Sequence, residues 1–175
     1  IHVYVLYPKG KVSPIQECQF TTLGKNITAL EIDGVFDDCQ ALVKNAFMDK
    51  ELNEHMKLTS ANSINVARFL PQAFYYFNAY ARMKEKGMAD NLVMCVPSGN
   101  FGNIFAGYIA KLMGTPIGTL VCASNKNNIL TDFLKSGVYD RTREFYTTMS
   151  PSMDILISSN LERLLYTVAG CEKTA

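Results

Sequence analysis

Short apolar runs alternate with amphipathic segments along this chain of 175 residues. The runs are rich in Val, Ile, Leu or Tyr and mostly end at Pro, Gly or small polar residues, which is typical of β-strands. They cover residues 3–7, 27–32, 92–96, 117–123 and 154–157. None alternates strictly between apolar and polar positions, which favours strands buried on both faces, as in a parallel sheet.

Helical periodicity occupies the segments between these runs. One predicted helix has Asp37 as its N-cap, with Gln40 as the capping-box partner. A longer one runs from about residue 60 to 86 and should kink at Pro71. Further helices are predicted after residue 103 and over residues 129–136 and 161–168. Residues 49–59 are predicted to be irregular. The alternation of strands and helices predicts an α/β fold: a three-layer αβα arrangement around a mainly parallel, Rossmann-like sheet, in a single domain over residues 1–175.

Charge and composition narrow the classes of partner. The chain has 17 basic and 16 acidic side chains without a long basic run, which argues against nucleic acid as the main partner. No uncharged apolar stretch reaches 18 residues, so we expect no membrane span. Five cysteines form no C-x-x-C pair, which favours a reduced, cytoplasmic setting. His2 and His55 lie far apart in sequence, so neither a metal site nor a Ser-His-Asp triad is predicted. The strand-like start at Ile1 leads us to expect a segment of a longer protein.

The most informative segment is the polar turn Ser98-Gly99-Asn100-Phe101-Gly102-Asn103, which joins the third strand to an amphipathic helix. Such a turn leaves backbone N–H groups unpaired at a helix N-terminus, where the helix dipole also favours negative charge. The turn is therefore suited to a phosphate group.

Several interpretations of this turn compete. It can be a tight βα turn that simply needs two glycines. Its spacing is not G-x-G-x-x-G, no acidic residue lies about 20 positions downstream to hold a ribose, and no Lys-Ser/Thr pair follows as in a Walker A loop. A mononucleotide-sized phosphate remains, such as that of pyridoxal phosphate.

Other polar positions have structural as well as functional explanations. Asn62-Ser63-Ile64-Asn65 can cap a helix or face a ligand. Gly107 is expected to allow close helix packing. The ends of the strands are small and polar, and none offers an evident acid or base, so the pattern fits a binding shelf better than a complete catalytic centre.

Taken together, five segments in this order resemble the threonine synthase family, pyridoxal-phosphate enzymes that make threonine from O-phosphohomoserine. They are Tyr7-Pro8-Lys9-Gly10-Lys11-Val12-Ser13-Pro14-Ile15-Gln16-Glu17, Phe36-Asp37-Asp38-Cys39-Gln40, Asn62-Ser63-Ile64-Asn65-Val66-Ala67-Arg68, Val96-Pro97-Ser98-Gly99-Asn100-Phe101-Gly102-Asn103 and Ser150-Pro151-Ser152-Met153-Asp154-Ile155-Leu156. The resemblance implies fold type II of the pyridoxal-phosphate enzymes. It also implies that the cofactor phosphate is held by Gly99, Asn100, Phe101, Gly102 and Asn103. Many relatives carry Asp where this chain has Asn103.

The resemblance also implies what this chain lacks. The family's Schiff-base lysine lies upstream in a Phe-Lys-Asp segment, which does not occur here; Phe133-Leu134-Lys135 is not a match. We therefore expect a middle fragment of the large cofactor-binding domain, without a catalytic residue of its own and inactive alone. Asn62, Ser63 and Asn65 are the expected substrate-proximal residues.

The intact enzyme would convert O-phosphohomoserine and water to threonine and phosphate. Two alternatives stay open: a related phospho-lyase that stops at elimination, and a non-catalytic α/β ligand-binding domain. The sequence does not predict the oligomeric state.

Overall fold

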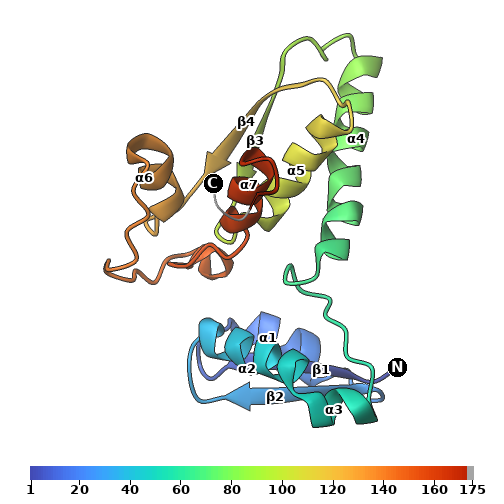
Figure 1. The fold of residues 1–175 in the computed structure, drawn as a ribbon, viewed down its shortest axis with the longest axis vertical. Coiled ribbons are helices and arrows are strands. Elements are labelled where there is room, and N and C mark those ends of the chain that lie inside the picture. Colours follow the sequence, from blue (N-terminus) through green and yellow to red (C-terminus); the bar gives the residue numbers. More distant parts are fainter. Residues whose placement is uncertain (173–175) are drawn as a thin grey trace. The chain divides into compact units, whose positions relative to one another are not determined.

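Residues 1–172 are described by a computed structural model of the chain (Figure 1). They divide into two compact units, residues 1–59 and the residues from 60 onward. Each unit contains one pair of parallel strands with helices packed against it, so the predicted α/β class with parallel pairing is confirmed. The single domain over residues 1–175 stays a prediction.

The first unit consists of two strands and three helices. Its elements are β1 (Val3–Pro8), α1 (Pro14–Thr21), β2 (Ile27–Ile32), α2 (Phe36–Met48) and α3 (Lys50–His55). The two strands pair in parallel from Val3 opposite Ile27 to Pro8 opposite Ile32. Helix α1 begins at Pro14, because the Ser13 hydroxyl accepts the N–H of Gln16 at 3.2 Å and proline suits the first helical turn.

Two local expectations in this unit are wrong. The N-cap of helix α2 is Val35, two residues before the expected Asp37, and the Asp38 carboxylate, rather than an Asp37–Gln40 pair, accepts the N–H of Val35 at 2.7 Å. The region expected to be irregular contains α3, because the Asp49 side chain caps it by accepting the N–H of Leu52 at 3.0 Å. A short polar helix with one good cap carries too little apolar periodicity to be recognised in sequence.

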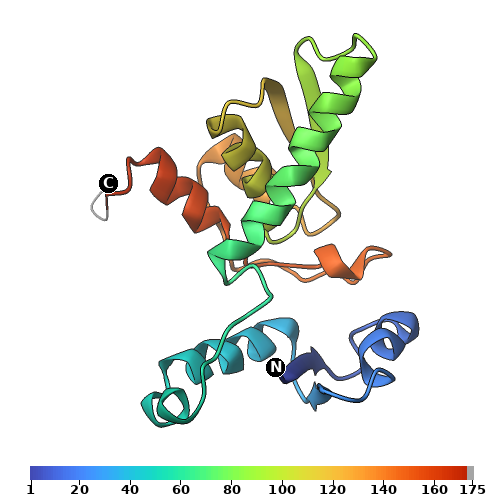
Figure 2. The same ribbon diagram turned by 90° about the vertical axis from the view of Figure 1, so that its right-hand side faces the viewer.

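The second unit is built around a second parallel pair. Its elements are the 3₁₀ turn η1 (Val66–Arg68), α4 (Phe69–Glu85), β3 (Leu92–Pro97), α5 (Gly102–Leu112), β4 (Ile117–Ala123), α6 (Ile129–Ser136), the 3₁₀ turn η2 (Pro151–Met153) and α7 (Leu161–Val168). Strands β3 and β4 are parallel. Figures 1 and 2 show α4 and α5 side by side, with α5 between α4 and the strands. The helix α5 therefore has neighbours on two sides.

The core of this unit lies between α4, α5 and the strands. Phe69 and Phe105 meet edge to face with ring centres 5.3 Å apart, and Ala106 and Ala110 are fully buried. Gly107 allows the two helices to approach, because a Cβ there would lie 2.6 Å from Cζ of Tyr76. The expectation that Gly107 serves close helix packing is confirmed.

Three expectations for the second unit are corrected. Residues 60–65 form a loop, and helix α4 begins only at Phe69. Pro71 therefore lies in the first turn of α4, where a missing N–H removes no helical hydrogen bond, so the reason to expect a kink disappears. Residues 154–157 are not a strand, although three of the four are apolar; they follow η2 and lead into α7.

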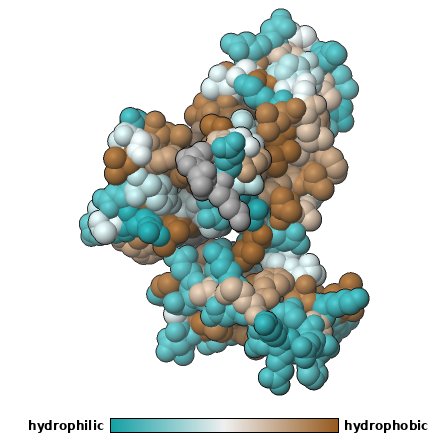
Figure 3. All heavy atoms as spheres, in the orientation of Figure 1, coloured by the Kyte–Doolittle hydropathy of each residue, from teal (hydrophilic) through white to brown (hydrophobic). Residues whose placement is uncertain are grey.

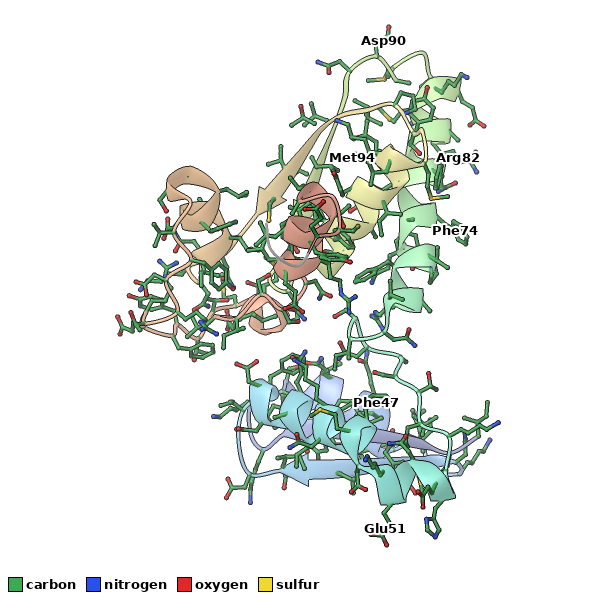
Figure 4. The ribbon with its side chains drawn as sticks, viewed as in Figure 1. Phe47, Glu51, Phe74, Arg82, Asp90 and Met94 are labelled. Atoms are coloured by element: carbon green, nitrogen blue, oxygen red, sulfur yellow. The ribbon has the colours of Figure 1, made fainter. Side chains whose placement is uncertain are left out.

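One face of the β3–β4 pair is exposed among the described residues. Val93 and Val121 are 55% and 41% exposed, whereas Met94, labelled in Figure 4, lies on the other face and packs against the core. On α4, Phe74 is 61% exposed, and Figure 3 shows hydrophobic residues at the surface in the region of that helix. None of the helices formed by residues 1–172 is long and apolar enough to cross a membrane.

Candidate functional site

The polar turn between β3 and α5 has an unusual backbone. Phe101 adopts a left-handed conformation, with φ of +64°, although it is not glycine. This conformation costs about 1 kcal/mol for a residue with a side chain. The ring is only 5% exposed and belongs to the core, so its burial offsets that cost and fixes the shape of the turn.

The turn presents five consecutive N–H groups without an acceptor. Among the described residues, the N–H groups of Gly99, Asn100, Phe101, Gly102 and Asn103 donate no hydrogen bond. Phe101 and Gly102 are buried, where an unpaired donor is costly. Successive N–H groups around a left-handed residue form a concave anion-binding surface, and the N-terminus of the 11-residue helix α5 adds a favourable dipole. The residues present therefore fit a phosphate group.

The side chain of Asn103 is used inside the turn. Its amide donates to the carbonyl of Pro97 at 2.8 Å, and its Oδ1 accepts from the Ser98 hydroxyl at 2.7 Å and from the N–H of Ile104 at 2.9 Å. These bonds connect the end of β3 to the first turn of α5. An amide can both donate and accept, whereas a carboxylate here could not donate to Pro97. The side chain of Asn103 is therefore occupied within the turn, and its backbone N–H is the group that can donate to a phosphate.

Both glycines of the turn lie against neighbouring segments. A Cβ at Gly99 would lie 3.1 Å from the Cα and the carbonyl oxygen of Met153, which are backbone atoms. A Cβ at Gly102 would lie 3.3 Å from the Cβ of Ser63 and 3.4 Å from the Nδ2 of Asn160. The glycines therefore allow the turn to pack closely against residues far away in sequence.

A buried polar cluster attaches the turn to two other segments. Asn160, which is 1% exposed, donates from Nδ2 to the carbonyl of Asn100 at 3.0 Å and to the hydroxyl of Ser63 at 3.1 Å. The Asn100 side chain accepts from the N–H and the hydroxyl of Ser159 at 2.7 and 2.8 Å. Arg163 donates to Oδ1 of Asn160 at 3.1 Å and to the carbonyl of Ile64 at 2.8 Å. The turn is thereby held from both sides.

The three residues predicted to lie near a substrate separate in the structure. Ser63 lies beside the turn, 3.4 Å from Nδ2 of Asn100. Asn62 is exposed and accepts from the Ser63 hydroxyl at 3.1 Å. Asn65 caps η1, because its Oδ1 accepts the N–H of Ala67 at 3.0 Å. For Asn65 the capping explanation therefore holds, and substrate contact by all three stays a prediction.

Two residues of this region were missed in the sequence. Asn160 precedes α7 but makes no side-chain cap, and its amide bonds the Asn100 carbonyl of the turn instead. Asp154 was placed in a strand, yet its carboxylate accepts four hydrogen bonds in a loop, from Asn125, Asn127 and Thr148. The only sequence signal was the small polar character of the segments that follow the strands.

The pKa values of two titratable side chains in this region, Tyr76 and Asp154, are shifted from their ordinary values. Burial raises the pKa of Tyr76 to about 12, so its hydroxyl stays protonated and donates to the carbonyl of Asn103 at 2.7 Å. Partial burial on its own would raise the pKa of Asp154, but the hydrogen bonds from Thr148, Asn125 and Asn127 lower it below its usual range. Asp154 is thus an ionised acceptor at neutral pH.

The fold and the turn are of the kind found in α/β proteins in which backbone N–H groups beyond the carboxyl end of a parallel strand are suited to a phosphate group. Among residues 1–172, no three His, Cys, Asp or Glu side chains come together as a metal site would require. Among the described residues, the arrangement is suited to an anion and offers no evident acid–base pair.

Comparison with known proteins shows similarity to threonine synthases. The chain is 50% identical over 167 residues to the threonine synthase of Eremothecium gossypii, an alignment that covers 95% of this chain and 32% of the relative. The crystal structure of the Escherichia coli threonine synthase matches 96% of this chain and 39% of its own, with a TM-score of 0.87 and 44% identity. A pyridoxal-phosphate-bound threonine synthase from Brucella melitensis matches with a TM-score of 0.79 and 48% identity. No family model matches the chain.

These matches confirm the fold that the resemblance implied. They extend over nearly the whole chain, yet the chain spans only about a third of the length of the curated relatives it matches. It therefore shares sequence and fold with one contiguous part of those enzymes.

Proposed function

We propose that this chain is the part of a threonine synthase that binds the phosphate of pyridoxal phosphate, at the turn from Gly99 to Asn103. The observation that supports this most directly is the row of five N–H groups, two of them on buried residues, that have no acceptor among the described residues. A bound phosphate would satisfy them, as expected for buried donors.

The chain's own residues would hold the cofactor in one place. The backbone N–H groups bind the phosphate. The hydrogen bonds from the Ser98 hydroxyl to Asn103 and from the Asn103 amide to Pro97 connect the two ends of the turn. Asn160 fixes the Asn100 carbonyl and the Ser63 hydroxyl, so that residues 60–65 stay beside the turn. When bound, pyridoxal phosphate supplies an electron-withdrawing ring that stabilises negative charge on substrate carbon atoms.

The proposed overall reaction is the conversion of O-phosphohomoserine and water to threonine and phosphate. We expect the reactive lysine to belong to an upstream segment of the full-length protein, and residues 1–175 to be inactive alone. Ser63 is the predicted substrate-proximal residue with the strongest support, because it lies 3.4 Å from Asn100 in the polar cluster.

The test is an assay of the full-length protein with O-phosphohomoserine and pyridoxal phosphate. We expect threonine and inorganic phosphate in equal amounts. Release of phosphate with a keto acid and without threonine would indicate that the full-length protein is a phospho-lyase and not a threonine synthase. Absence of any reaction, together with failure to bind pyridoxal phosphate, would overturn the proposal.

A further inference from the structure

Asp154 lies at the centre of a hydrogen-bond network beyond the carboxyl end of β4. Its Oδ1 accepts from the side-chain amides of Asn125 at 2.7 Å and Asn127 at 2.9 Å and from the Thr148 hydroxyl at 2.8 Å. Its Oδ2 accepts the N–H of Thr148 at 2.8 Å. Four donors converge on one carboxylate, which binds the loop after β4 to residues 148–154.

The network continues to the phosphate-binding turn through one residue. Met153 precedes Asp154, and its Cα and carbonyl oxygen lie 3.1 Å from the position of a Cβ on Gly99. Further bonds hold Met153 in place, because its N–H donates to Ser150 at 2.8 Å and its carbonyl accepts from Ile155 at 2.9 Å. The backbone that Asp154 fixes is therefore the backbone against which the turn packs.

The two loops are also connected through the strands. The N–H of Ser98 donates to the carbonyl of Ala123 at 3.0 Å, where β4 ends. Asn125, one of the donors to Asp154, follows two residues later. The turn is thus supported on one side by Ala123 and on the other by Met153, and the Asp154 carboxylate links both supports.

We propose that Asp154 is a positioning residue for the phosphate-binding turn: through Met153 and the loop after β4, it holds the N–H groups of residues 99–103 in the arrangement that fits one phosphate. This inference rests on the proposed function of the turn. It requires a carboxylate at position 154, since all four surrounding groups donate and an amide there would direct its own N–H groups at one of them.

The experiment compares two ligands that differ only in the phosphate. Dissociation constants of pyridoxal 5′-phosphate and of pyridoxal are measured by absorbance or fluorescence titration of the full-length protein, for the wild type and for Asp154→Asn. We expect the wild type to bind the phosphorylated ligand more tightly. In Asp154→Asn this preference should fall about tenfold, given the usual strength of hydrogen bonds to a charged group. The affinity of Asp154→Asn for pyridoxal should change less than twofold. General destabilisation would weaken both ligands alike.

Four further variants complete the design, one of them the single Gly99→Ala with which the double variant is compared. Asp140→Asn is the matched control, because within the described part of the chain the exposed Asp140 carboxylate accepts only from Thr142 in its own loop, and it should keep the wild-type preference. Thr148→Val removes one of the four donors and should give a smaller loss, which can be measured even if Asp154→Asn does not fold. Gly99→Ala combined with Asp154→Asn should lose no more preference than the stronger single variant, because both act on the contact with Met153.

The outcomes separate the two claims. Equal affinities of the wild type for both ligands would overturn the proposed function of the turn. A wild-type preference that Asp154→Asn and Thr148→Val both retain would overturn the role of Asp154 and leave the phosphate site standing.

Discussion

Replacing Gly107 by alanine places a methyl group where the ring of Tyr76 already lies. The added Cβ would be 2.6 Å from Cζ and 3.0 Å from Cδ1 of that ring, well inside ordinary contact. Tyr76 is 7% exposed and cannot swing into solvent without leaving the core. Its hydroxyl also donates to the carbonyl of Asn103 at 2.7 Å, so a displaced ring loses a contact to the first turn of α5.

The free energy of this change has three contributions. Overpacking of a well-packed core costs about 1–3 kcal/mol. Loss of the Tyr76–Asn103 hydrogen bond costs about 1 kcal/mol. The change from Gly to Ala within a helix by itself stabilises the folded state by about 1 kcal/mol. We therefore expect Gly107→Ala to destabilise the protein by about 1–3 kcal/mol, whereas helix propensity alone predicts the opposite sign.

The assay is equilibrium urea unfolding of the full-length protein and its variants. In a Tyr76→Ala background the ring is absent, so the same Gly107→Ala change should now stabilise by about 1 kcal/mol. This reversal of sign is the control for the proposed clash. A stabilising effect of Gly107→Ala in the wild-type background would refute the packing argument.

Two further predictions concern the polar network. Asn160→Asp puts a carboxylate against the Asn100 carbonyl and the Ser63 hydroxyl, so we expect a loss of about 1–3 kcal/mol in urea unfolding, and an unchanged midpoint would contradict the buried cluster. Burial alone would raise the pKa of Asp154, but the hydrogen bonds to its carboxylate lower this pKa below 3.8. The ionised carboxylate therefore contributes its full stabilisation above about pH 4, and this stabilisation is lost as the pH falls through the folded-state pKa. The difference in unfolding free energy between wild type and Asp154→Asn should therefore shrink below pH 4, and a difference that grows there would show that the carboxylate is not stabilised in the folded state.

Local patterns predicted much of the fold. The strands β2 and β4 have the predicted boundaries, because each apolar run is flanked by clear turn residues. Helix α5 follows the polar turn as expected and ends before Gly114, whose φ is +100°. Residues 154–157 show where local patterns fail, since they do not pair as a strand and Ile155 packs against Gly99 of the turn instead.

The candidate site was predictable only in part. The two glycines and the strand-to-helix position identified the turn, because phosphate binding by backbone N–H groups depends on local geometry. The roles of Asn160 and Asp154 depend on contacts across 60 and 29 positions of sequence, to Asn100 and Asn125, which no local pattern encodes. Asn65 had two explanations in sequence, and only its observed bond to Ala67 identified the cap.

The central claim is that the N–H groups of residues 99–103 bind the phosphate of pyridoxal phosphate. The most direct measurement is a crystal structure of the full-length protein with this cofactor bound. We predict phosphate oxygens within hydrogen-bond distance of the N–H groups of Phe101 and Gly102, with Phe101 still left-handed. A phosphate bound elsewhere, with these N–H groups paired to protein or to water alone, would contradict the account.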